Sequence, residues 1–229
     1  MLSNRIQTLK DGLFAEKRVV SLERAKLYTE SWQKTEGEPV IIRRAKALTN
    51  ILEQCEIQIK DGELIIGDRT VKPRSGVLSP EMSPYWILEE LDLFPTRPQD
   101  KFNISDEDKA YYKDILYPYW AGRSLKDYCE QHLPDHIKAA TKTKIFSLNQ
   151  TDKGQGHIIP DYKIVFEHGL KSLIENAEHN LEKNPSHDFY KASVIVLKAT
   201  QAYILRHAAL AKTIESNEKD KTRQSELET

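Results

Sequence analysis

The stretch ASVIVLKATQAYILRHAALA, residues 192–211, is the longest apolar stretch in the chain. Its apolar side chains surround most of a helix, and such a helix is normally buried on several sides. Polar side chains that include Lys198, Arg206 and His207 interrupt the stretch, so it would be costly to place across a bilayer. We therefore expect a helix over about residues 188–214 that is buried in protein. Because the rest of the chain is mostly polar, we expect this helix to be covered incompletely.

Outward from this helix, apolar residues recur at three- and four-residue steps over most of the chain. Tyr162, Phe166 and Leu170 begin one such series, which predicts a long amphipathic helix that ends at Asn184 and Pro185. The same spacing over residues 3–55 predicts three more helices. The predicted fold class is therefore mainly α.

Residues 57–67 have a different pattern, because two short apolar runs flank Asp61 and Gly62. An Asp-Gly pair between apolar runs is a strong hairpin signal, so we expect a short β-hairpin here. The whole chain is expected to form one region of seven segments. They are helices over residues 1–55, the hairpin over 57–67, a loop-rich part over 68–103, helices over 104–142, a pocket loop over 143–160, long helices over 161–214 and a polar end over 215–229.

The composition of the polar end, residues 215–229, favours a frayed tail, and the alternative is a segment that leads into a further element. The chain has 34 basic and 35 acidic side chains and a formal net charge of −1. This balance disfavours a general nucleic-acid or membrane-surface binder. Two cysteines, Cys55 and Cys129, cannot form a disulfide framework and are interpreted as small buried residues. No apolar signal-peptide region is visible at the beginning, so we expect a cytoplasmic protein.

Candidate chemistry is sparse. Gly154 and Gly156 allow close approach of the backbone to a ligand, and His157 follows them directly. A histidine placed there could donate a hydrogen bond to a substrate oxygen, and the alternative is an ordinary loop histidine satisfied by the backbone. No metal site is expected, because Pro134 separates His132 and His136 and no HExxH pattern is present. Several aromatic side chains lie close together in residues 111–120, and we expect them to pack in a core or an interface.

Nine short motifs in order carry a resemblance to a known family. They are SLERA at residues 21–25, TEGEP at 35–39, RRAKAL at 43–48, ELIIG at 63–67, PR at 73–74, PE at 80–81, YW at 119–120, GQGH at 154–157 and DY at 161–162. This series resembles the amino-terminal region of the glycyl radical enzymes, in the pyruvate formate-lyase-like branch that includes the B12-independent glycerol dehydratase. The likeness covers essentially the whole chain.

The resemblance implies a fold and a chemistry. Family members enclose their active site in a ten-stranded α/β barrel wrapped by helices, and this chain would supply outer helices and one wall of the pocket. A glycyl radical, installed by an activating enzyme that uses S-adenosylmethionine and an iron–sulfur cluster, passes to a cysteine that abstracts hydrogen from a small-molecule substrate. By resemblance, His157 hydrogen-bonds a substrate hydroxyl, and Asp161 either contacts the same pocket or caps the following helix. The family also tends toward homodimers.

Departures from the family pattern imply that this chain is a fragment. The family's cysteine loop reads Gly-Cys-x-Glu, whereas Cys55 follows Gln54 and Cys129 follows Tyr128. The radical loop, Arg-Val-x-Gly-Tyr, is also missing from the sequence. We therefore expect no catalytic residue, no bound cofactor and no activity in the chain alone, with the remainder of the enzyme polypeptide as its partner. The alternatives are a helical interaction subunit and a module that binds a small metabolite without catalysis.

Overall fold

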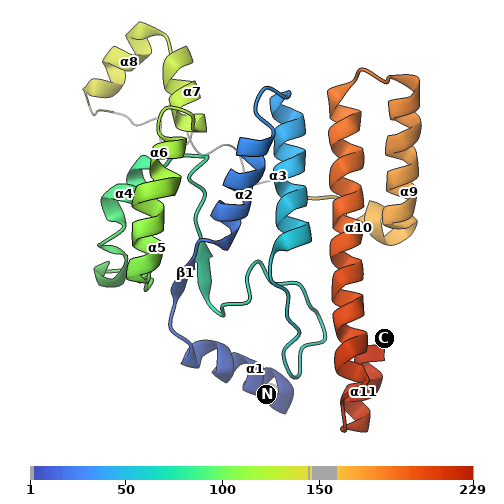
Figure 1. Cartoon of the computed structure of the whole chain (residues 1–229). Helices are drawn as coiled ribbons and strands as arrows, with labels where there is room; N and C mark the ends of the chain where they lie inside the picture. Colours follow the sequence, from blue (N-terminus) through green and yellow to red (C-terminus); the bar gives the residue numbers. More distant parts are fainter. Residues whose placement is uncertain (1–2, 144, 146–158, 229) are drawn as a thin grey trace. The chain divides into compact units, whose positions relative to one another are not determined.

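The computed structural model describes residues 3–143, 145 and 159–228 (Figure 1). The chain divides into two compact units. The first unit contains Met1–Lys17, Glu30–Ser75 and Asp161–Thr229, and the second contains Arg18–Thr29 and Gly76–Pro160. Helix α2, Glu23–Lys34, has residues in both units. Each unit is described below by itself.

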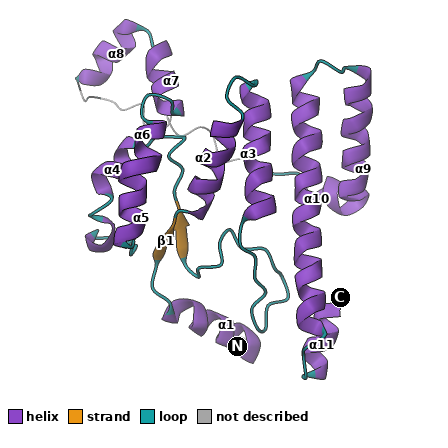
Figure 2. Cartoon of the chain, in the orientation of Figure 1, coloured by secondary structure: helices purple, strands orange, loops and turns teal. Residues whose placement is uncertain are grey.

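The described residues are mainly helical, as the sequence predicts (Figure 2). The first unit contains α1 (Asn4–Ala15), α3 (Val40–Gln54), α9 (Tyr162–Lys183), α10 (Asp188–Glu215) and α11 (Lys221–Glu228). The second unit contains α4 (Tyr85–Glu90), the 3-10 helix η1 (Phe94–Thr96), α5 (Asp106–Tyr111), the π-helical η2 (Tyr112–Leu116), α6 (Tyr117–Trp120), α7 (Leu125–His132) and α8 (Asp135–Lys142).

The small β-sheet lies elsewhere than the sequence predicts. Its two strands are β1 (Val19–Ser21) and β2 (Ser75–Val77), which pair with each other. The expected hairpin of residues 57–67 is wrong: only its turn forms, with Gly62 at φ +79°, and the flanking residues are not strands. A side-chain hydrogen bond stands here in place of pairing between strands: the backbone amide of Lys60 donates to Glu63 Oε2 at 2.9 Å.

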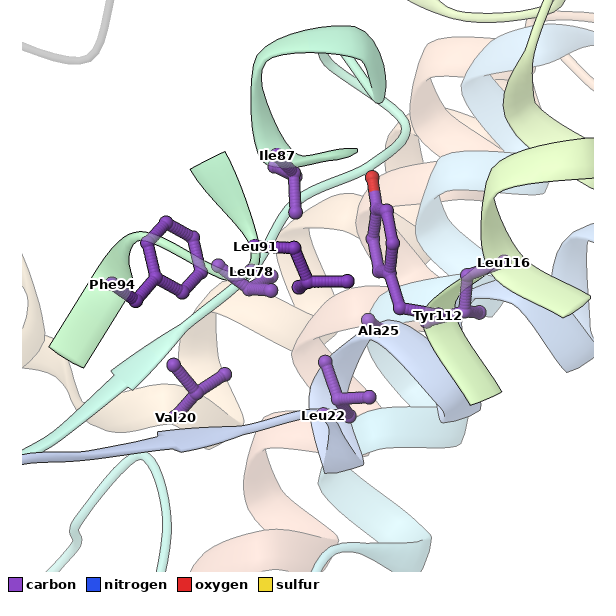
Figure 3. Close-up of a cluster of buried hydrophobic side chains, with 9 residues drawn as sticks. All are labelled: Val20, Leu22, Ala25, Leu78, Ile87, Leu91, Phe94, Tyr112 and Leu116. Carbon is purple, nitrogen blue, oxygen red and sulfur yellow. The ribbon is translucent and has the colours of Figure 1, made fainter. Parts of the chain in front are cut away.

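A buried cluster of apolar side chains forms the core of the second unit (Figure 3). Its members are Val20, Leu22, Ala25, Leu78, Ile87, Leu91, Phe94, Tyr112 and Leu116. The Tyr112 hydroxyl is the one polar side-chain group in this set, and it donates to the Pro84 carbonyl at 2.8 Å. Burial raises the pKa of Tyr112, so this hydroxyl stays protonated and keeps its hydrogen bond. The expectation that the aromatic residues of residues 111–120 pack in a core is confirmed by Tyr112 and Trp120.

The π-helical turn before α6 has a local cause in the sequence. Pro118 has no backbone N–H, and in an α-helix its ring would meet the carbonyl of Asp114. The wider turn instead bonds Tyr117 N–H to the Tyr112 carbonyl, five residues back. The helix therefore continues through the proline and carries both Tyr112 and Leu116 into the core.

Helix α10 organises the first unit and lies between α3 and α9 (Figure 1). Ala192 packs with Ile42 and Ala45 of α3. Arg206 then caps the carboxyl end of α3, donating to the Leu52 carbonyl at 2.6 Å and the Cys55 carbonyl at 2.7 Å. Such terminal carbonyls have no partner within their own helix, so the arginine satisfies groups that would otherwise need water.

The prediction that α10 is incompletely covered is confirmed. Its buried residues are Ala192, Ala199 and His207, and the apolar side chains of residues 194–197 are only half-buried. Ile204 and Leu205 are 52% and 61% exposed. A helix apolar around most of its circumference therefore presents apolar surface outside its contacts with α3, α9 and α11.

The polar end is not the frayed tail that its composition favours, because it contains α11. Arg223 of this helix donates to the carbonyls of Glu63 at 2.8 Å and Lys60 at 3.0 Å. Glu226 forms ion pairs with Arg5 and Arg223, and these guanidinium groups, Arg5 foremost, lower its pKa. Long side chains that reach backbone carbonyls thus fix α11, which has no buried residue of its own.

Asp127 gives the second unit a predicted pH dependence. It forms a capping box with Ser124 at the start of α7, and Tyr85 donates to its Oδ1 at 2.5 Å. Burial raises the pKa of Asp127, but hydrogen bonds from the Ser124 side chain, from Tyr85 and from the backbone amides of Ser124 and Gly122 outweigh it, so the pKa is lowered. A lowered folded-state pKa stabilises the fold above the unfolded pKa, near 3.8, and this stability is lost as pH falls through the folded pKa.

We therefore expect Asp127→Asn to cost about 1 kcal/mol at neutral pH, through the lost cap, and nearly nothing in strong acid. Urea unfolding followed by circular dichroism measures the free energy of unfolding of both proteins. It is done between about pH 2 and about pH 7, a range that spans the carboxyl pKa. The matched control is Asp135→Asn, because Asp135 is fully exposed in the first turn of α8. An equal pH dependence for the two variants would contradict the assignment.

Candidate functional site

Of the two candidate site residues, the structure describes only one. Asp161 is the N-cap of α9, and its carboxylate accepts a hydrogen bond from the Lys163 amide at 3.1 Å. This is the helix-capping alternative that the sequence left open. His157 lies outside the described residues, as do Gly154 and Gly156, so its predicted hydrogen bond to a substrate hydroxyl is not tested.

The segment that follows Asp161 is separated from the rest of α9. Gly169 has φ +70° and ψ +165°, a conformation that only glycine adopts readily, and it breaks the helix after residue 168. Residues 162–168 thus form a short helix of their own, and all seven are exposed. The sequence spacing predicts one continuous helix here, and the glycine within it was the available sign of the break.

The exposed short helix has two unlike faces. Tyr162, Val165 and Phe166 lie at the i, i+3 and i+4 spacing that places side chains on one side of a helix. Lys163 and Glu167 lie on another side and form an ion pair at 3.6 Å. We call the surface of Tyr162, Val165 and Phe166 the α9 apolar face.

The cysteines occupy structural positions. Cys55 is buried at the carboxyl end of α3, where its carbonyl accepts from Arg206, and Cys129 is half-buried in α7. Neither cysteine is part of a disulfide. The interpretation of Cys55 as a small buried residue is confirmed, and Cys129 is more exposed than expected.

His132, another candidate from the sequence, has its contacts within its own helix, α7. His132 contacts the Tyr128 carbonyl at 2.7 Å and lies against the Tyr128 ring. Across residues 3–143, 145 and 159–228, no group of three or more His, Cys, Asp or Glu side chains is arranged to hold a metal ion. No helix within the same residues is long and apolar enough to span a membrane.

Comparison with known proteins supplies the context for these features. The family model described as "Pyruvate formate lyase-like" matches residues 2–229. The chain is 32% identical to (2S)-3-sulfopropanediol dehydratase of Klebsiella oxytoca and 30% identical to isethionate sulfite-lyase of Oleidesulfovibrio alaskensis. In each case the match covers 98% of this chain and 29% of the relative.

The structure is also similar to a solved dehydratase. The glycerol-bound B12-independent glycerol dehydratase from Clostridium butyricum superimposes with a TM-score of 0.92 at 36% identity, over 99% of this chain and 30% of that chain. The chain thus spans about 30% of the length of these relatives, and nearly all of the chain is included in each match. On the match of the family model to residues 2–229, the chain belongs to the pyruvate formate lyase-like family of glycyl radical enzymes.

Proposed function

We propose that this chain is the amino-terminal region of a glycyl radical dehydratase or lyase that cleaves a bond in a small polar metabolite by radical chemistry. The observation that carries the proposal is the match to glycerol dehydratase over 99% of this chain but 30% of the dehydratase. The relatives with dehydratase and sulfite-lyase names support the same class of reaction. Their named substrates are small and polar, which supports a substrate of that kind here.

The residues in this chain suit a supporting role. The sequence contains neither Gly-Cys-x-Glu nor Arg-Val-x-Gly-Tyr, so it offers no position for the hydrogen-abstracting cysteine or the glycyl radical. Both belong, in this proposal, to the part of the relatives that the chain does not span. The partners are therefore that remainder, an activating enzyme, the substrate and, in the complete enzyme, a second copy. The complete enzyme is cytoplasmic in this proposal.

His157 would be the chain's contribution to the pocket. A donor aimed at the departing substrate oxygen stabilises the negative charge that develops on it as the bond breaks. Asp161 would act four residues later as the cap that starts α9, in line with its bond to the Lys163 amide. In this role Asp161 is a positioning residue.

The test is a chimera in which these 229 residues replace the matched 30% of the Clostridium butyricum glycerol dehydratase. After anaerobic activation by that enzyme's activating enzyme, we expect a glycyl radical signal by electron paramagnetic resonance and turnover of a small diol. The isolated chain, treated in the same way, is expected to give neither. Turnover by the isolated chain would refute the proposal. A folded chimera that carries the radical but converts none of glycerol, propane-1,2-diol and isethionate would refute it as well.

A further inference from the structure

The α9 apolar face exposes large apolar side chains, as surfaces that bind another protein segment do. Phe166 is 86% exposed and Tyr162 is 64% exposed, and the Lys163–Glu167 ion pair lies beside them on another side of the same short helix. Ile164, which lies away from this face, is less exposed at 42%. Amphipathic helices place such a stripe against a neighbour, because burying apolar area is favourable. The charged side already faces water and satisfies its own groups. The apolar side is therefore the one that needs a partner.

The break at Gly169 makes this surface an independent unit. Beyond the break, α9 contacts α10, and Ile174 is buried. Before the break, none of residues 162–168 is buried. Within the described part of the chain, the second part of α9 is thus used for packing, and the first part has no buried residue. The positive φ of Gly169 lets the two parts take different directions.

We infer that the α9 apolar face docks onto the part of the glycyl radical enzyme polypeptide that this chain does not span. The occupant is chosen from the comparisons: the fold is retained with a TM-score of 0.92 in a dehydratase of which only 30% is covered by the match, so the rest of that chain is available for contact. A second copy of this chain is the competing occupant. The inference rests on the proposed function, but it concerns assembly and not turnover.

Trypsin cleavage after Lys163 tests the docking, because this side chain is 76% exposed in the chain by itself. We compare the isolated 229-residue chain with the glycerol dehydratase chimera described above. Docking is expected to slow cleavage at Lys163 by roughly tenfold or more in the chimera, since a covered helix must open before it is cut. Equal cleavage rates in the two proteins would overturn the inference. Protection in the isolated chain, together with a dimer in analytical ultracentrifugation, would assign the face to a second copy instead.

Matched variants locate the protection on this face. Phe166→Ser in the chimera is expected to restore rapid cleavage, and Val165→Ala, which removes less apolar area, to restore it in part. Glu167→Gln on the charged side should leave the chimera protected. Circular dichroism of each variant separates undocking from global unfolding. Full protection in folded Phe166→Ser and Val165→Ala chimeras would refute the docking. Loss of turnover with protection intact would instead count against the proposed function alone.

Discussion

Replacing Trp120 with alanine is expected to destabilise the second unit by about 3–5 kcal/mol, the largest stability effect we expect for a single residue here. Trp120 is 1% exposed, and the centroid of its ring lies 6.0 Å from that of the Tyr28 ring and 5.2 Å from that of the Tyr119 ring. Its Nε1–H donates to Thr29 Oγ1 at 2.8 Å. Alanine would leave a cavity among rigid aromatic neighbours and would remove a buried hydrogen bond. Urea unfolding followed by far-ultraviolet circular dichroism measures the loss.

Two variants separate the packing from the hydrogen bond. Thr29→Val keeps the shape of the side chain but leaves the Trp120 N–H without this acceptor, and it is expected to cost about 1–3 kcal/mol. Trp86→Ala serves as the size-matched control, because Trp86 is 39% exposed and loses less buried area. Equal destabilisation by Trp120→Ala and Trp86→Ala would contradict the role given to Trp120 in the core.

Replacing His157 with alanine in the chimera is expected to lower turnover by about 100- to 1,000-fold, the usual cost of removing one donor to a developing negative charge. The radical signal should persist, because the radical-bearing part of the chimera is unchanged. The change is therefore expected in kcat for a diol substrate and not in activation. Radical content and initial rates, measured on the same sample, distinguish the two effects.

Two controls accompany the His157 variant. Asp161→Asn keeps a good N-cap side chain, so a residue that only caps α9 should tolerate the change with little loss of turnover. His179→Ala removes an exposed histidine from the body of α9 and should leave the rate unchanged. If His157→Ala retained full turnover, the histidine would be an ordinary loop residue. A large loss in Asp161→Asn would instead move Asp161 into the pocket.

Periodicity predicted the helices well, and local caps explain where several of them begin. Ser124 and Asp127 form the capping box that starts α7, and Ser105 accepts from the Asp108 amide at the start of α5. The helix of residues 188–214 was predicted within a residue of its observed bounds, Asp188–Glu215. In each case the stabilising group lies within a few residues of the group that it satisfies, so the sequence alone carries the information.

Predictions failed where distant residues compete with local preference. The Asp61–Gly62 turn favours a hairpin, but Arg223 donates to the carbonyls of Lys60 and Glu63, and Arg5 packs its side chain against Gly62. A two-stranded ribbon is marginally stable without a surface to lie on, so these contacts decide the outcome. Arg223 also fixes α11, a segment that its composition alone would predict to be a frayed tail.

The helical class, the apolar helix α10 and, through nine ordered motifs, the family could be predicted from the amino acids alone. The folded chain was needed to find that Val19–Ser21 pairs with Ser75–Val77 and that Gly169 divides α9. It was also needed to find that the α9 apolar face is exposed. The physical reason is range: caps and periodicity act between residues a few positions apart, whereas burial depends on which distant segments are present to cover a surface.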